Sequence, residues 1–374
     1  MKLSSFPYFG NATLDFPKGR NKERRFMEWK DGGTPYEITV EMMRDSDDLA
    51  RERRPKIKAA MEHAWKGYKK YAPYGEDEVF PISGFDHAKA KTKVGTTLID
   101  SLDTMWIMDM KKEFWEARDW VRDSLNQNVD EDKSVFETTI RNLGGLMSSY
   151  DLSGDTVFLE KAIELGDKLI LAYNTKSGAP LAEVNLLSNA IKNQPWSRRH
   201  TSLADCALQI EFRNLSKISG NSTYAEKSEY VIKALERLTP PNGIHSAEVD
   251  NLSEEVRLIE TSAASKMTFG GQADSFFEYL LKTWIQGGKK ESFYREMYDK
   301  AIQGLHNELI YKSSPSGLLF LHEKISGEVN VNIMDHLACF AGGKFNIQFE
   351  RLSSECTSSN LHFTTRDAIF GGIY

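Results

Sequence analysis

The chain has 374 residues, of which 40% are hydrophobic and 27% charged, a composition that is typical of a soluble globular protein and excludes a disordered or collagen-like chain. The formal net charge of −6 and the lack of a basic stripe argue against binding to nucleic acid through its phosphates. No stretch approaches the roughly 20 apolar residues that cross a bilayer, and the N-terminal residues lack the apolar core of a signal peptide.

Residues 1–50 are polar and show no sustained hydrophobic period, which predicts a flexible leader. From Glu52 onward apolar residues recur at helical spacing and form one stripe. The members of this stripe are Ile57, Met61, Ala64, Trp65 and Tyr68. Alternating strand patterns are confined to short pieces at residues 317–324 and 328–334, so the sequence predicts an all-α fold with minor β-hairpins.

Three later segments share one plan: residues 134–170, 202–235 and 271–305 each read as a helix, a glycine-bearing turn and a second helix. The first helices are expected to end at Ser153-Gly154, Ser219-Gly220 and Gly287-Gly288. Such a repeat predicts helical hairpins that pack side by side, with the first helices in an inner layer. An α/α toroid and an open solenoid both fit this period, and the apolar first helices favour the closed ring.

An acidic residue stands in the opening turn of each first helix: Glu137, Asp205 and Asp274. Sixty-eight residues separate the first two acids (137 to 205) and 69 separate the last two (205 to 274). The near-equal spacing places all three acids at the same end of the assembly. A ring of carboxylates around one opening is suited to acid and base chemistry on sugar hydroxyls and glycosidic oxygens.

Further acids stand near these positions. Asp274 and Glu278 lie four residues apart on one helix face, where two like charges repel each other. Either Asp274 supports the helix N-terminus while Glu278 meets a cation, or the two carboxylates line a pocket. Glu137 and Arg141 have the spacing of a surface ion pair. Asp103 and its neighbour Asp100 lie in an apolar run, where a carboxylate needs hydrogen-bond donors or a ligand.

Other chemistries lack support, because the sequence contains no nucleophile elbow, P-loop, zinc-protease or dinucleotide-binding motif in a suitable context. Three cysteines, Cys206, Cys339 and Cys356, allow at most one disulfide. Four N-x-S/T sequons begin at Asn11, Asn214, Asn221 and Asn251. They hint at a secretory route, although such tripeptides also recur by chance.

Six segments resemble, in order, the signature blocks of the class I α-1,2-mannosidases, glycoside hydrolase family 47. The segments are HAWKGYKKYA, TLIDSLDTMWIM, FETTIRNLGGLMSSYDLSGD, LQIEFRNLSKISG, ADSFFEYLLKTWIQGG and MDHLACFAGG, and they extend from about residue 50 to 345. The resemblance implies an (α/α)7 barrel, here with about five of seven helix pairs. It also implies inverting removal of terminal α-1,2-linked mannose from high-mannose N-linked glycans, and a Ca2+ ion that holds substrate hydroxyls.

The resemblance also implies roles for single residues. Glu137 falls on the general acid, which acts through a water, and Asp274 on a second essential carboxylate. The implied substrate-binding residues are Asp103, Arg141, Asp205 and Glu278, with Asp205 standing where the family usually has Glu. Cys339 falls on a disulfide cysteine, for which Cys356 is a substitute partner. Gln272 stands at a position linked to the choice of glycan branch, where the endoplasmic-reticulum branch has Arg.

The sequence departs from the family pattern after Gly343. The family's later blocks, which carry the catalytic base and a calcium-ligating threonine, have no counterpart before Tyr374, so no metal ligand is predicted in this chain. The expected organisation is a leader (1–50), a partial barrel (51–345) and a divergent tail (346–374). The resemblance implies an α-1,2-mannosidase of the endoplasmic reticulum or Golgi lumen, inactive if the base is lost. The alternative is a non-catalytic glycan-binding protein.

Overall fold

The computed structural model describes residues 40–341 with gaps at 73, 85–93, 196, 198, 260–265, 316, 326–327 and 331–332. Contacts between Cα atoms divide the chain into two compact units, residues 1–53 and 54–374. In the first unit the described segment, 40–53, is helical. The predicted division into leader, partial barrel and divergent tail stays a prediction, because residues 1–39 and 342–374 lie outside the described part.

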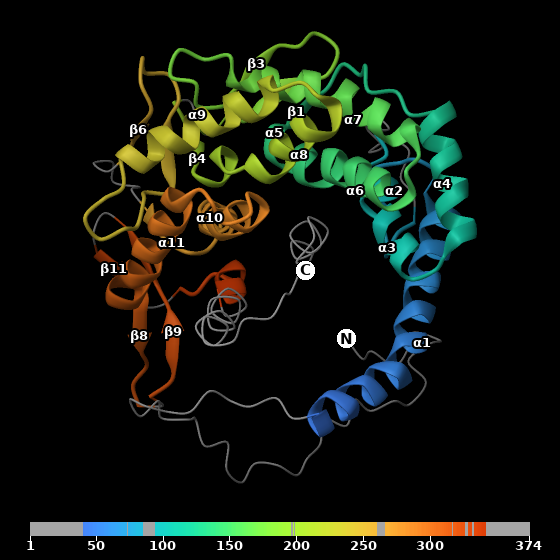
Figure 1. The fold of residues 1–374 in the computed structure, drawn as a ribbon, viewed down its shortest axis with the longest axis horizontal. Coiled ribbons are helices and arrows are strands. Elements are labelled where there is room, and N and C mark those ends of the chain that lie inside the picture. Colours follow the sequence, from blue (N-terminus) through green and yellow to red (C-terminus); the bar gives the residue numbers. More distant parts are fainter. Residues whose placement is uncertain are drawn as a thin grey trace. The chain divides into compact units, whose positions relative to one another are not determined.

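Helices dominate the described residues, which confirms the predicted class (Figure 1). Their bounds are α1 Val40–Tyr71, α2 Thr96–Asp100, α3 Leu102–Ile107, α4 Lys111–Asp123, α5 Val135–Thr138, η2 Thr139–Leu143, α6 Gly144–Ser153, α7 Thr156–Leu169, η3 Ile170–Tyr173, η4 Ala204–Cys206, α8 Gln209–Ser219, α9 Thr223–Arg237, α10 Asp274–Gln286, α11 Ser292–Gly304, η5 Leu305–Leu309 and η6 His336–Phe340. Of these, η2 and η5 are π-helical turns, and η3, η4 and η6 are 3-10 turns.

The helix predicted from Glu52 belongs to α1, which begins twelve residues earlier, at Val40. Its predicted apolar stripe is only partly correct. Trp65 and Tyr68 are buried, whereas Ala64 is exposed and the Ile57 side chain is 57% exposed. Trp65 and Tyr68 therefore belong to the core, Met61 packs against it in part, and Ile57 and Ala64 face solvent.

The three predicted hairpins are confirmed as α5–η2–α6 with α7, α8 with α9, and α10 with α11. The first helices end at Ser153, Ser219 and Gln286, as the glycines predict. Gly154 and Gly220 adopt φ angles of 72° and 79°, a left-handed conformation that glycine takes without strain. The chain therefore reverses after each first helix.

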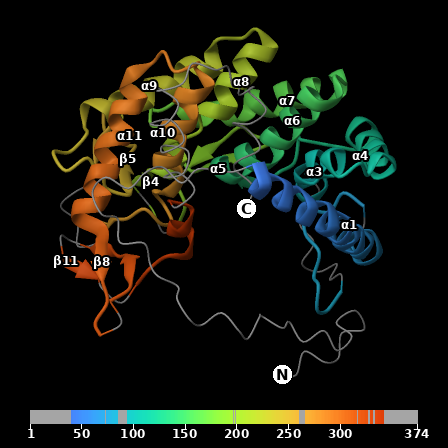
Figure 2. The same cartoon turned by 60° about the horizontal axis from the view of Figure 1, so that its bottom comes forward.

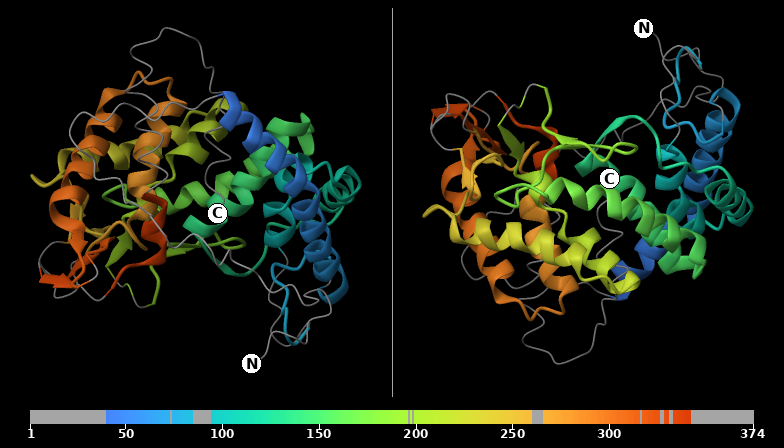
Figure 3. Two further views of the ribbon diagram at one scale, coloured as in Figure 1. Left: turned by 90° about the horizontal axis from the view of Figure 1, so that it is seen from below. Right: turned by 90° about the horizontal axis from the view of Figure 1, so that it is seen from above.

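Successive hairpins pack side by side. The first helix α8 contacts α6 on one side and α10 on the other, so the three first helices form one row (Figure 1). The pair α10 and α11, in orange, stays adjacent in other views (Figures 2 and 3). This arrangement is the predicted inner layer. Closure of that layer into a ring stays a prediction.

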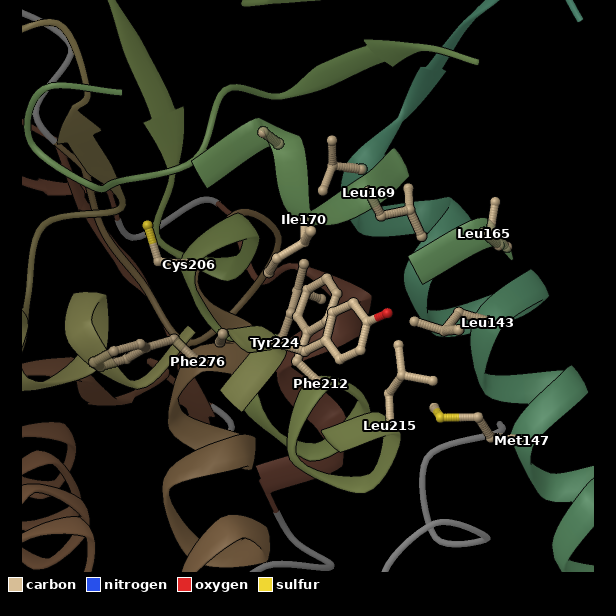
Figure 4. Close-up of a cluster of buried hydrophobic side chains, with 14 of the residues drawn as sticks. Leu143, Met147, Leu165, Leu169, Ile170, Cys206, Phe212, Leu215, Tyr224 and Phe276 are labelled. Atoms are coloured by element: carbon tan, nitrogen blue, oxygen red, sulfur yellow. The ribbon is translucent and has the colours of Figure 1, made fainter. Parts of the chain in front are cut away.

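The hydrophobic core lies between the hairpins. Phe212 and Leu215 of α8 and Tyr224 of α9 are buried beside Met147 of α6 (Figure 4). Burial of side chains of this size stabilises the fold by roughly 1.5–3 kcal/mol each. The Tyr224 hydroxyl also donates a 2.6 Å hydrogen bond to Asp167 of α7, which fixes the second hairpin to the first.

Short antiparallel strands connect the hairpins and form the sheets β1–β2–β3, β4–β5–β6, β11–β10–β7 and β8–β9. Their bounds are β1 Asp132–Ser134, β2 Glu183–Asn185, β3 Ile191–Lys192, β4 His200–Ser202, β5 Glu248–Asp250, β6 Arg257–Leu258, β7 Lys266–Met267, β8 Ile310–Lys312, β9 Leu319–Leu321, β10 Glu323–Ile325 and β11 Glu328–Asn330. The strands predicted at residues 317–324 and 328–334 are confirmed as β9, β10 and β11.

These strands position the helix starts. Ser134, the last residue of β1, precedes α5. One residue separates β4 from η4, and β7 precedes α10. Each of the three predicted acids therefore follows a strand that a sheet holds in place. Within the part of the chain that the structure describes, no helix combines the length and apolar character that a membrane crossing requires.

Candidate active site

Glu137 stands in the first turn of α5, where the Ser134 hydroxyl accepts a 3.2 Å hydrogen bond from the Glu137 backbone amide. Its side chain is 52% exposed, and Oε2 accepts a 2.8 Å hydrogen bond from Arg141 Nε. The predicted ion pair is thus present. Arg141 belongs to the π-helical turn η2, a distortion that is frequent at functional sites.

Arg141 has a second carboxylate partner. Arg141 Nη1 lies 3.4 Å from Oδ2 of Asp100, which belongs to α2 and stands 41 residues earlier in the chain. Burial raises the pKa of Asp100, and the Arg141 charge opposes that rise. Arg141 therefore holds two carboxylates from two helices beside each other.

Asp103 is buried, and its carboxylate is hydrogen-bonded to groups of the protein itself. It is 4% exposed, and its oxygens accept hydrogen bonds from the Thr104 amide at 2.6 Å and from the Ser148 hydroxyl at 3.0 Å. Burial raises its pKa. The donors expected for a carboxylate in this apolar run are therefore supplied by α3 and α6.

Asp205 lies in the 3-10 turn η4, four residues before α8 begins, and not in the opening turn of that helix as predicted, because its side chain bonds back toward β4. Oδ2 accepts from Thr201 Oγ1 at 2.8 Å and from the Ser202 amide at 3.1 Å, and the Asp205 amide donates to Ser202 Oγ at 3.0 Å. Burial raises the pKa of Asp205, the hydrogen bonds from Thr201 and Ser202 oppose that rise, and the negative charge of Glu137 adds a smaller contribution to it. Glu137 and Asp205 thus share one electrostatic environment.

Asp274 is the half-buried first residue of α10, and its amide donates a 2.9 Å hydrogen bond to Gly270 O. Glu278, one turn later, accepts a 2.5 Å hydrogen bond from Lys282 Nζ. Glu278 therefore meets a cation, Lys282, as the first of the two alternatives drawn from the sequence expects. Gln272, just before the helix, has a φ of 77°, an uncommon left-handed conformation for a residue with a side chain.

The segments that carry the three acids are neighbours. The turn η4 packs against both α5 and α10. The Ala204 amide donates a 2.9 Å hydrogen bond to Gln272 O, two residues before Asp274. The fold therefore brings together the helix starts that bear Glu137, Asp205 and Asp274, as the repeat predicts, and Arg141 adds Asp100.

The structure also reveals an acid that the sequence analysis missed. Glu211 of α8 is 8% exposed, and its Oε1 accepts a 2.6 Å hydrogen bond from the Tyr279 hydroxyl of α10. Burial raises its pKa to about 7, and Tyr279 and Lys282 oppose the rise. Its other oxygen has no hydrogen-bond partner among the described residues. In the sequence, the position of Glu211 between the apolar residues Ile210 and Phe212 was the only indication that this acid would be buried.

No metal centre forms in the described ranges, where no three His, Cys, Asp or Glu side chains are placed to hold an ion. The calcium implied by the resemblance thus finds no fitting set of ligands there, and we assign it to no residue of this chain. Cys339 is exposed and Cys206 is buried, and neither is paired in that part of the structure. The suggested partner Cys356 lies outside the described residues.

Comparison with known proteins identifies the family. The sequence profile of glycosyl hydrolase family 47 matches residues 60–366, and so takes in residues 346–366 of the predicted tail. A solved structure of an α-1,2-mannosidase from Trichoderma reesei superposes with a TM-score of 0.72 at 25% identity, covering 82% of this chain and 65% of that one. The mostly helical fold is therefore that of the Trichoderma enzyme.

Curated relatives agree with the profile. Mannosyl-oligosaccharide 1,2-alpha-mannosidase IA of Sus scrofa is 42% identical over 80% of this chain and 45% of its own length. The Arabidopsis thaliana enzyme MNS1 is 42% identical over 79% of this chain and 52% of its own length. The endoplasmic reticulum enzyme of Rattus norvegicus is 40% identical over 78% of this chain and 43% of its own length. The chain spans about half the length of these relatives. With the profile covering most of its residues, the chain belongs to glycosyl hydrolase family 47.

Proposed function

We propose that this chain provides part of an inverting α-1,2-mannosidase that removes terminal α-1,2-linked mannose from high-mannose N-linked glycans. The names of the relatives at about 40% identity support this substrate. The structural observation that carries the proposal is the meeting of three helix starts, each with a carboxylate, at η4. The relatives named for the endoplasmic reticulum support a lumenal location.

We assign the general acid to Glu137. Arg141 holds Oε2, which orients the carboxyl group and leaves Oε1 for proton delivery through a water to the glycosidic oxygen. The exposure of this side chain gives substrate access to it. Inversion further requires a base that activates a water on the opposite face of the sugar, and we assign no residue of this chain to that step.

The remaining acids have binding and supporting roles in this proposal. We assign Asp274 as the second carboxylate of the site, and Asp205 and Glu278 as acceptors of hydrogen bonds from sugar hydroxyls. Arg141 positions Glu137 and Asp100. Asp103 has a structural role in the site, because it accepts its hydrogen bonds from Thr104 and Ser148.

Mannose release from a high-mannose oligosaccharide tests the proposal. The purified full chain is incubated with the glycan, and free mannose is quantified. Glu137→Gln should lower the rate by roughly 10²–10⁴-fold, the usual contribution of a general acid. The matched control is Glu160→Gln, an exposed glutamate on α7, which should leave the rate unchanged.

Two results would overturn the proposal. Equal rates for the chain and Glu137→Gln would remove Glu137 from the mechanism. Binding of the same glycan without any release of mannose, measured by glycan array and abolished by Asp274→Asn, would instead support the non-catalytic glycan-binding protein.

A further inference from the structure

Three of the four sequons lie among the described residues, and the structure distinguishes their asparagines. An N-linked glycan is attached to the side-chain nitrogen Nδ2, so a folded protein accommodates it only where that nitrogen reaches solvent. The exposure and hydrogen bonds of Asn214, Asn221 and Asn251 therefore decide which sequon is compatible with the fold.

Two of these asparagines are enclosed. Asn214 of α8 is 3% exposed, and its Nδ2 lies 3.5 Å from Asp151 Oδ2 on α6. Asn251 is 1% exposed, and its Nδ2 donates to Pro180 O at 2.9 Å and to Asn193 Oδ1 at 2.8 Å. A sugar on either nitrogen would occupy space that other segments fill and would break these contacts.

Asn221 differs from both. It is exposed in the turn between α8 and α9, directly after Gly220. Its Oδ1 accepts a 3.1 Å hydrogen bond from the Thr223 amide, an Asx turn that holds the side chain at the surface. The side-chain amide of Asn221 also neighbours the Tyr224 hydroxyl. If a sugar on Asn221 displaces this contact, the Tyr224 hydroxyl keeps its hydrogen bond to Asp167.

The position of Asn221 also keeps a glycan away from the candidate active site. Asp205 lies before the N-terminus of α8, and Asn221 follows its C-terminus. The 11 residues of α8 separate them by about 16 Å along the helix axis, at 1.5 Å per residue. A glycan at this turn therefore leaves the carboxylate end of the hairpin open.

We propose that Asn221 is an N-glycosylation site of this protein and that Asn214 and Asn251 stay unmodified. The inference rests on the lumenal location in the proposed function, where a lipid-pyrophosphate-linked oligosaccharide is the sugar donor. The transfer forms the bond between Nδ2 and the anomeric carbon of the first sugar. It breaks the bond from that carbon to the lipid pyrophosphate, which leaves as the Nδ2 proton is lost.

The test expresses the full chain in human cells behind a cleavable secretion signal, so that entry into the lumen is not a variable. A glycan-removing amidase in 18O-water converts each glycosylated Asn into 18O-labelled Asp, which peptide mass spectrometry locates. Label is expected at Asn221 and absent from Asn214 and Asn251. Asn221→Gln and Thr223→Ala should abolish it, whereas Thr223→Ser keeps the sequon and should retain it.

Unlabelled Asn221, or label at Asn214 or Asn251 in the folded secreted protein, would overturn the inference. Reading the label in both the lumenal and secreted pools prevents poor folding from hiding the result. Mannose release is measured on the same samples and should not change in Asn221→Gln. A glycan at Asn221 without mannosidase activity would overturn the proposed function alone.

Discussion

The Tyr279 hydroxyl of α10 donates a 2.6 Å hydrogen bond to Glu211 of α8. The two residues are 68 positions apart and join two neighbouring first helices, α8, which follows Asp205, and α10, which begins with Asp274. Because Glu211 is buried, this bond is a polar link inside the contact between α8 and α10, to which Gln286 adds a 3.0 Å hydrogen bond to Ile210 O. It holds two sides of the candidate site together.

Removal of this hydroxyl should destabilise the fold. In Tyr279→Phe the buried Glu211 loses its donor, so the free energy of unfolding should fall by about 1–3 kcal/mol. Tyr298→Phe is the matched control, because the buried Tyr298 hydroxyl has no hydrogen-bond partner among the described residues. Urea denaturation measures both variants. Equal losses would show that the Glu211 contact contributes nothing specific.

Glu211 should make stability depend on pH. Its pKa is raised from 4.5 to about 7 in the folded chain, so the folded state binds more protons than the unfolded state between these values. The contribution of Glu211 to the free energy of unfolding is fully present below pH 4.5. It is lost as the pH rises to about 7, a decline of about 3 kcal/mol.

The neutral variant Glu211→Gln keeps an acceptor for Tyr279 and should remove this decline. It should therefore be more stable than the unmodified chain at pH 8 and show a flatter curve between pH 5 and 7. Parallel curves for the two proteins in urea denaturation at pH 5, 6, 7 and 8 would contradict the raised pKa.

The adjacent glycines Gly144 and Gly145 provide a matched pair for helix packing. A Cβ atom at Gly145 would lie 2.7 Å from the Ile99 carbonyl oxygen, so Gly145→Ala should cost about 1–3 kcal/mol by pushing α6 away from α2. A Cβ atom at Gly144 would have Thr139 O at 3.6 Å as its nearest neighbour, an ordinary contact. Gly144→Ala should instead stabilise α6 by roughly 0.5–1 kcal/mol. Thermal denaturation of both variants distinguishes these signs.

Arg141 should act on catalysis more than on stability. Arg141→Lys keeps the charge but loses the planar fork that joins Glu137 to Asp100. The side chains of Arg141 and Glu137 are 47% and 52% exposed, so unfolding should change by less than about 1 kcal/mol. Misplacement of Glu137 should lower kcat by up to about 10²-fold. Arg122→Lys, in an exposed ion pair on α4, is the control and should leave kcat unchanged.

Asp103 should show the opposite balance. Asp103→Asn weakens the charge-assisted bonds from Thr104 and Ser148 and should cost about 1–2 kcal/mol of stability, with KM for the glycan unchanged. Stability is measured by urea denaturation and KM from mannose release. A rise in KM at unchanged stability would move Asp103 into direct contact with substrate.

The repeat explains why much of this fold was predictable. The spacing of Glu137, Asp205 and Asp274 places equivalent helix starts at one end of successive hairpins, and glycines such as Gly154 mark the turns. The short strands β2 and β3 were not predicted, because two or three residues are too few to show an alternating pattern.

Contacts between distant residues were also beyond the sequence. The spacing of Glu137 and Arg141 predicts their ion pair, but the second bond of Arg141 to Asp100 depends on how α2 packs beside η2. In the same way, Glu211 becomes a buried acid only once α10 brings Tyr279 beside it. Such relationships follow from tertiary packing and not from local pattern.

The anomeric form of the released sugar tests the central claim most directly. If Glu137 is the general acid of an inverting hydrolysis, proton NMR of the full chain acting on α-1,2-linked mannobiose should show β-mannose first, with the α form appearing only by later mutarotation. Glu137→Gln should produce neither form at a comparable rate. Initial release of α-mannose, or equal release by Glu137→Gln, would contradict the account.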